Sequence, residues 1–179
     1  FKARALMKLY NFRKNEGTAV SEYLTPDILD TEYKFFFNDC DVIICCVDNH
    51  PARKASIEAA IQCNKPILVC ANEYHTSQAF YYDPKLVHDF PHMHPYARYP
   101  EIATDRSGSP VNCQGVALES DPQLAIANQV AAGFGNFLLW SWHGMQPTDH
   151  VEYMPCEFQS TFSRLQTITV GDLTKLKLA

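Results

Sequence analysis

The sequence contains no long apolar run, no Cys-x-x-Cys pair and no Gly-x-Gly-x-x-Gly turn. A membrane-spanning helix needs about 20 consecutive apolar residues, so we expect no membrane partner. Structural zinc sites usually contain paired cysteines, so we expect no such site. With a net charge of −5, the chain also lacks the basic excess of nucleic-acid-binding domains, and we expect no nucleic-acid partner.

The composition and the cysteines indicate one globular domain in a reducing compartment. The chain has 179 residues, of which 46% are hydrophobic and 20% charged, as is typical of a domain with a substantial core. The number of cysteines is odd, and Cys45, Cys46 and Cys70 lie inside apolar runs, where thiols act as small hydrophobic groups. We therefore expect reduced thiols and a cytoplasmic location.

The first residues have the pattern of a helix interior. The chain does not begin with Met, and residues 1–7 do not resemble a signal peptide. We therefore expect a fragment, or a mature chain whose upstream part is missing.

Apolar runs alternate with helix-like segments in the first half of the chain, which predicts parallel βαβ units. We expect an α/β fold with a Rossmann-like, mostly parallel sheet flanked by helices, a long crossover loop, a closing helix and C-terminal antiparallel strands. The expected strands are at 18–23, 41–47, 65–71, 77–82, 151–153 and 158–170, the helices at 1–12, 29–38, 51–62 and 122–142, and the proline-rich loop at 83–120.

The segment ending in Val47-Asp48-Asn49 is the most informative stretch of the sequence. An apolar run stops there, and a helical pattern with Pro51 in its first turn follows at once. Ligands bind beyond the carboxyl ends of parallel strands, where an Asp can hold Mg²⁺ or accept hydrogen bonds from a nucleotide. The alternative is a helix cap, because Asp and Asn side chains accept hydrogen bonds from the first-turn N–H groups. The spacing leaves both interpretations open.

The strand end and the start of the chain both resemble one known family. Asp48-Asn49 followed by Arg53 resembles the Asp-Asn-x-x-x-Arg signature of the ThiF/MoeB/HesA group, and Lys2-Ala3 resembles its Lys-Ala step. This group is related to ubiquitin-activating enzymes, and the likeness is greatest to its divergent bacterial, plasmid and phage branch. In the family the aspartate binds Mg²⁺-ATP and the lysine contacts the ATP phosphates.

The resemblance extends into the second half of the chain. Asn72 lies where the family has a polar loop before a Gly-Gln-Val-like strand, although Ser77 replaces the usual glycine. Cys113, in a polar segment before an Ala/Gly-rich helix, resembles the crossover-loop cysteine of the branch. An exposed thiol of this kind can act as a nucleophile, and the alternative is an inert loop cysteine.

The resemblance implies a single incomplete ThiF-like domain that depends on ATP and Mg²⁺. Residues 1–82 would be the second half of the nucleotide-binding sheet, 83–120 the crossover loop, and 121–179 the closing helix and C-terminal strands. The implied activity is adenylation of the C-terminal carboxylate of a ubiquitin-like or sulfur-carrier protein, followed by a thioester on Cys113, in a homodimer. The family's glycine-rich turn is expected upstream of Phe1, so this stretch alone would not complete an ATP site.

Each candidate also has a plainer interpretation. Lys2 could be a solvated helix residue, and Arg53 could pair with Glu58, although a spacing of five is not ideal. The loop histidines His88, His92 and His94 suggest a metal cluster, but they could instead be solvated or hydrogen-bonded. The whole chain could be a binding or scaffold subunit without chemistry, or half of another Rossmann-type enzyme.

Overall fold

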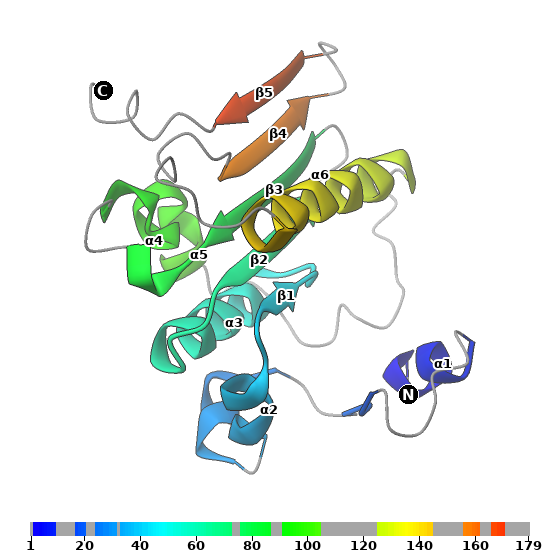
Figure 1. Cartoon of the computed structure of the whole chain (residues 1–179), viewed down its shortest axis with the longest axis vertical. Coiled ribbons are helices and arrows are strands. Elements are labelled where there is room, and N and C mark those ends of the chain that lie inside the picture. Colours follow the sequence, from blue (N-terminus) through cyan, green and yellow to red (C-terminus); the bar gives the residue numbers. More distant parts are fainter. Residues whose placement is uncertain are drawn as a thin grey trace.

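The computed structural model describes most of the chain, with gaps. The described residues are 2–9, 17–20, 24–31, 33–72, 76–86, 91–104, 125–144, 156–161 and 166–170. In chain order they form α1 (Lys2–Leu9), η1 (Pro26–Asp30), α2 (Lys34–Asp39), β1 (Ile43–Cys45), α3 (His50–Gln62), β2 (Ile67–Asn72), β3 (Thr76–Tyr82), η2 (Pro84–Leu86), η3 (Pro91–Met93), α4 (Pro95–Arg98), α5 (Pro100–Thr104), α6 (Ala125–Gly144), β4 (Glu157–Thr161) and β5 (Gln166–Val170) (Figure 1).

The five strands form one mixed sheet in the order β1-β2-β3-β4-β5. β1 and β2 are parallel, whereas β2–β3, β3–β4 and β4–β5 are antiparallel. The predicted α/β class and the C-terminal antiparallel strands β4 and β5 are confirmed, but the prediction of a mostly parallel sheet is wrong. Only residues 73–75 separate β2 from β3, and a parallel return requires a crossover of a dozen or more residues.

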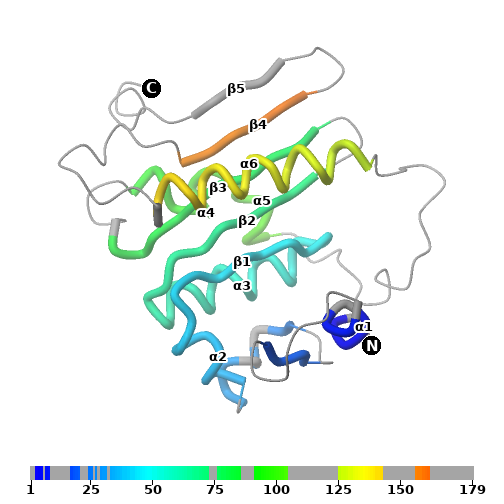
Figure 2. The backbone as a smooth tube through the Cα atoms, turned by 45° about the vertical axis from the view of Figure 1, so that its right-hand side comes forward, coloured from blue at the N-terminus to red at the C-terminus, as the bar shows by residue number. Residues whose placement is uncertain are grey.

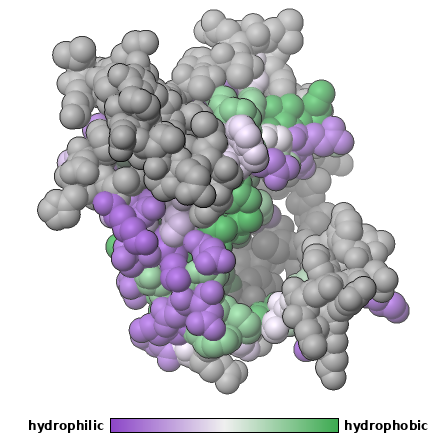
Figure 3. Space-filling model, viewed as in Figure 1, coloured by the Kyte–Doolittle hydropathy of each residue, from purple (hydrophilic) through white to green (hydrophobic). Residues whose placement is uncertain are grey.

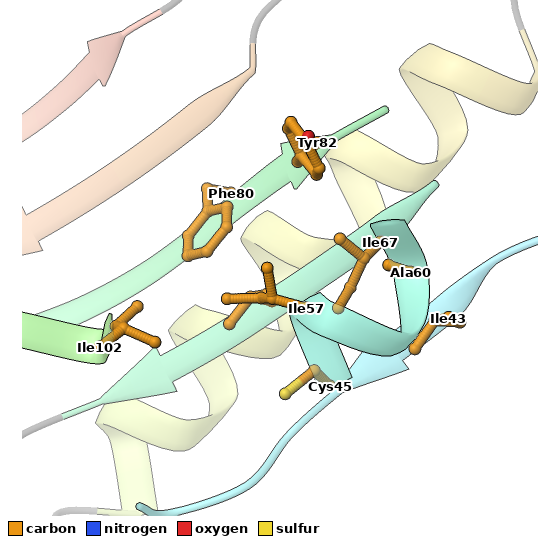
Figure 4. Close-up of a cluster of buried hydrophobic side chains, with 9 residues drawn as sticks. Ile43, Cys45, Ile57, Ala60, Ile67, Phe80, Tyr82 and Ile102 are labelled. Atoms are coloured by element: carbon orange, nitrogen blue, oxygen red, sulfur yellow. The ribbon is translucent and has the colours of Figure 1, made fainter. Parts of the chain in front are cut away.

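Helices cover both faces of this sheet. Alternate residues of β2 point to opposite faces, so Ile67 and Val69 pack with Ile57 of α3, while Leu68 packs with Leu138 of α6. Figure 4 shows the first of these clusters, where side chains of α3 meet those of β1, β2 and β3. Helix α6 crosses β2 and β3 on the other face, as the views in Figures 1 and 2 both show.

The proline-rich segment after β3 contains short helices rather than only irregular loop. Pro84, Pro91, Pro95 and Pro100 are each the first residue of a helical element. Proline suits this position because its fixed φ is helical and its missing N–H would have no partner in a first turn. The prolines that predicted a loop therefore mark helix starts, and α5 packs against α3.

The N-terminal part departs from the predictions in two places. The expected helix over 29–38 is divided into η1 and α2, and residues 18–20 of an expected strand are not in a strand. Helix α1 lies outside the layers formed by the sheet, α3 and α6 (Figures 1 and 2).

Hydrophilic and hydrophobic residues gather in different parts of the face that Figure 3 shows. Hydrophilic residues dominate around α3, and hydrophobic residues gather near α6 (Figure 3). Phe35 and Phe36 of α2 are exposed hydrophobic residues as well. Ile126, Phe137 and Trp140 of α6 are exposed, while Trp142 stacks on Tyr81 of β3 in the core. No described helix combines the length and the apolar character that crossing a membrane requires.

Candidate functional site

The candidate site lies at the carboxyl ends of the two parallel strands. β1 ends at Cys45 and β2 at Asn72, and their parallel register places Cys45 beside Val69. Asp48 and Asn49 follow β1, so they belong to the same edge of the sheet as Asn72. The Asp48 side chain is exposed and that of Asn49 is half-buried. The topology thus gives Asp48, Asn49 and Asn72 a common edge of the sheet.

Asn49 is the N-cap of α3. Its Oδ1 accepts a hydrogen bond from the Ala52 N–H at 2.8 Å, and its backbone is extended, with φ −138° and ψ 154°. The cap leaves the carboxamide nitrogen free to donate to Asp48 Oδ1 at 3.2 Å. The cap interpretation is therefore confirmed for Asn49, and the same side chain orients the Asp48 carboxylate at the helix start.

Arg53 joins the strand end to the helix. Its Nη2 donates to the carbonyl oxygen of Val47 at 3.2 Å, whereas the described ion pair of Glu58 is with Lys54, at 3.9 Å. Pairing of Arg53 with Glu58, the plainer interpretation, is therefore not what the structure shows. The guanidinium holds the connection between β1 and α3.

Two buried donors at this site lack partners among the described residues. They are the Nε of Arg53 and the Nδ2 of Asn72. Buried polar groups in native proteins are nearly always hydrogen-bonded, so each unsatisfied one requires an explanation. Both can donate to an acceptor oxygen, and a ligand with several such oxygens would satisfy them.

The side chains at this edge fit a magnesium–nucleotide complex better than a metal ion bound by protein ligands alone. Within the described ranges no group of three His, Cys, Asp or Glu residues could hold a metal. Mg²⁺ is commonly bound through one or two carboxylates together with substrate phosphates and water, and the exposed Asp48 could supply one. The residues present therefore fit such a complex.

The structure does not describe the side chains of two of the predicted site residues. Cys113 lies outside the described residues, and so does the side chain of Lys2, although its backbone begins α1. Their assigned roles stay predictions. Ser77, at the position of the family's usual glycine, is fully buried, and its hydroxyl donates to the Ala127 carbonyl at 2.7 Å. This serine ties β3 to α6.

Of the loop histidines, His94 has a clear structural role. Its Nδ1 accepts a hydrogen bond from the Tyr96 N–H at 3.2 Å and so caps α4. Its ring also packs against the rings of Tyr82 and Tyr96. Burial lowers the pKa of His94, which favours the neutral ring that a cap acceptor requires. His88 lies outside the described residues.

Sequence reasoning missed a buried polar cluster around Glu157. This side chain is almost fully buried at the start of β4. It accepts hydrogen bonds from Gln78 Nε2 at 2.9 Å, from the Tyr99 hydroxyl and from Arg98 Nη2. The only signal in the sequence is a charged residue between Cys156 and Phe158.

The Glu157 cluster has a structural role. Burial, followed by the hydrogen bond to Glu157, raises the pKa of Tyr99, which therefore remains a neutral donor. The carboxylate accepts hydrogen bonds from three donors, whereas the buried Nε of Arg98 has no partner among the described residues. The cluster joins the segment containing α4 to the central strands of the sheet.

Comparisons with known proteins bear on the fold only. No protein-family model matches the chain, and no curated protein matches it. Solved structures do match, including one titled "Crystal Structure of SeMet PaaA", with 15% sequence identity and a TM-score of 0.50. The match covers 84% of this chain and 47% of that chain, so this chain spans about half the length of PaaA. At such low identity the likeness concerns the α/β fold and leaves the activity open.

Proposed function

We propose that the chain supplies one wall of an ATP–Mg²⁺ site in a ThiF-like adenylyltransferase with a Rossmann-like nucleotide-binding region. The observation that carries the proposal is a pair of buried donors that have no partner in the described part of the chain. They are Arg53 Nε and Asn72 Nδ2, at the sheet edge that also bears Asp48. The order of Lys2, Asp48-Asn49, Arg53 and Cys113 in the sequence supports the same family. The substrate would be the C-terminal carboxylate of a ubiquitin-like or sulfur-carrier protein.

In this proposal each residue at the edge has a defined task. The Asp48 carboxylate, oriented by Asn49, would hold the magnesium ion, and Arg53 and Asn72 would donate hydrogen bonds to nucleotide oxygens. When bound, Mg²⁺ would neutralise charge on the phosphates. The carrier carboxylate would attack the α-phosphorus of ATP, which forms an acyl-adenylate and releases pyrophosphate. Donors already in place for the developing charge would stabilise the transition state.

Replacing Asp48 with alanine tests this assignment. We expect ATP–pyrophosphate exchange, measured with the complete gene product and a candidate carrier protein, to fall by about 100-fold, the scale for losing one charge-stabilising contact. Asp41→Ala is the matched control, because Asp41 is also exposed but precedes β1 at the other end of the strand. Circular dichroism would verify that both variants fold.

The outcome also separates the proposal from its main rival. Exchange at the wild-type rate in Asp48→Ala would remove Asp48 from the mechanism. The rival is a binding or scaffold subunit. It is favoured because Asn49 and Arg53 make structural hydrogen bonds at the start of α3. Micromolar ATP binding without exchange would support a subunit that binds nucleotide but lacks chemistry. An absence of ATP binding by the complete gene product would contradict the nucleotide site itself.

Cys113 would act after adenylation. Its thiolate would attack the acyl-adenylate carbonyl, forming a thioester and releasing AMP. We expect Cys113→Ala to abolish a carrier conjugate that is visible on a non-reducing gel and cleaved by thiols, while ATP–pyrophosphate exchange persists. Cys63→Ala is the control, because Cys63 is a half-buried thiol at the end of α3. An undiminished thioester in Cys113→Ala would exclude this role.

A further inference from the structure

Cys46, which directly follows β1, and Cys70 of β2 come together on the α6 face of the sheet. The register of β1 and β2 pairs Cys45 with Val69, so Cys46 and Cys70 are the next positions along the two parallel chains. Their thiols lie close enough to shift each other's pKa. Cys45 instead faces α3 with the core residues Ile57 and Ile67. The pair therefore consists of Cys46 and Cys70, and their thiols are free.

A disulfide between these two positions requires only a small movement of the backbone. Neighbouring strands lie about 4.8 Å apart, within the Cα separation of about 4.4–6.8 Å that disulfides span. A disulfide also needs Cβ atoms about 3.8 Å apart, so the two chains must move together slightly. β1 ends at Cys45, so Cys46 lies beyond the paired residues and can make this movement.

The surroundings give the two thiols different exposure. Cys46 is exposed, whereas Cys70 is half-buried beneath α6, with its sulfur 2.6 Å from the position that a Cβ on Gly135 would occupy. A small oxidant can therefore reach Cys46 first. Cys70 is held beside it as the second thiol.

We propose that Cys46 and Cys70 form a dithiol that a hydroperoxide converts into a cross-strand disulfide. The Cys46 sulfur attacks the peroxide, the O–O bond breaks, and Cys46 becomes a sulfenic acid while the peroxide leaves as an alcohol or water. The Cys70 sulfur then attacks the Cys46 sulfur, the S–O bond breaks, and water leaves. Two thiols and one hydroperoxide thus give one disulfide, one alcohol or water and one further water. A dithiol reductant reverses the change.

The test treats the protein with hydrogen peroxide and maps disulfides by mass spectrometry. We expect a Cys46–Cys70 link with a loss of two hydrogens, which dithiothreitol reverses. It should be absent from Cys46→Ser and Cys70→Ser but present in the control Cys63→Ser. A trivalent arsenical, phenylarsine oxide, probes the reduced pair independently, because it needs two adjacent thiols. We expect one equivalent to bind the wild type and none to bind Cys46→Ser.

Oxidation that stops at a sulfenic or sulfinic acid on Cys46, or that links Cys46 to a different cysteine, would overturn the proposal. So would equal arsenical binding by the wild type and Cys46→Ser. Because Cys46 is exposed and lies outside the strand ladder, Cys46→Ser is expected to fold, and its thermal unfolding would verify this.

Discussion

Replacing Glu157 with alanine should destabilise the protein by about 3–5 kcal/mol, the range for breaking a buried ion pair by removing one partner. The Arg98 side chain is mostly buried beside it, so the change would leave a guanidinium charge without its carboxylate. The Tyr99 hydroxyl and the Gln78 amide would lose an acceptor as well. Urea unfolding followed by circular dichroism would measure the free energy of unfolding.

Two further variants make the Glu157 result interpretable. Glu101→Ala removes an exposed carboxylate from the nearby helix α5, and we expect a change within about 0.5 kcal/mol. If Glu157→Ala does not fold, Glu157→Gln removes the charge but keeps an acceptor, and should fold with lower stability than the wild type. If the free energy of unfolding of Glu157→Ala falls by less than about 1 kcal/mol, the ion-pair argument is contradicted.

Removing both charges tests why Glu157→Ala loses stability. In the double variant Arg98→Met with Glu157→Met, neither charge remains to be buried alone. Apolar replacement of a whole buried pair is often neutral or stabilising. We therefore expect the double variant to be more stable than the sum of the two single changes predicts.

The second large effect is expected from adding one methyl group to α6. At Gly135 a Cβ would lie 2.6 Å from Cys70 Sγ and 3.3 Å from Leu68 Cδ2, too close for either atom to remain in place. Such overpacking typically costs about 1–3 kcal/mol, partly offset by the helix propensity of alanine, worth about 1 kcal/mol over glycine.

Gly133 provides a matched control on the same helix. No atom lies within 4 Å of a Cβ at this position, so Gly133→Ala should stabilise the protein by up to about 1 kcal/mol. We expect Gly135→Ala to be less stable than Gly133→Ala by about 1–3 kcal/mol in urea unfolding. Equal stability of the two variants would show that Cys70 and Leu68 move aside without loss.

Local sequence patterns located most of the central elements. The expected helix at 51–62 is α3 within one residue, and the expected strands at 65–71 and 77–82 are β2 and β3 within two. These predictions succeed because hydrophobic periodicity and helix capping act between residues close in sequence. The capping role open to Asn49 is of the same kind, since its partner Ala52 is three residues away.

The division of the chain into 1–82, 83–120 and 121–179, the homodimer and the adenylation activity stay predictions.

The sequence could place Asp48 and Asn72 at strand ends, because apolar runs stop there. It could not show that Arg53 Nε and Asn72 Nδ2 would be buried without partners among the described residues, because burial depends on how the helices pack on the sheet.

By itself the sequence determined where β1, α3, β2, β3 and α6 form and which residues begin the helices, since those choices are local. Only the tertiary structure decided that β3 runs antiparallel to β2 and that Cys46 lies beside Cys70. It also decided that Glu157 meets Arg98, 59 residues away, and Gln78, 79 residues away. Strand direction and the partners of a buried charge depend on contacts between distant segments, and no local pattern in the sequence specifies them.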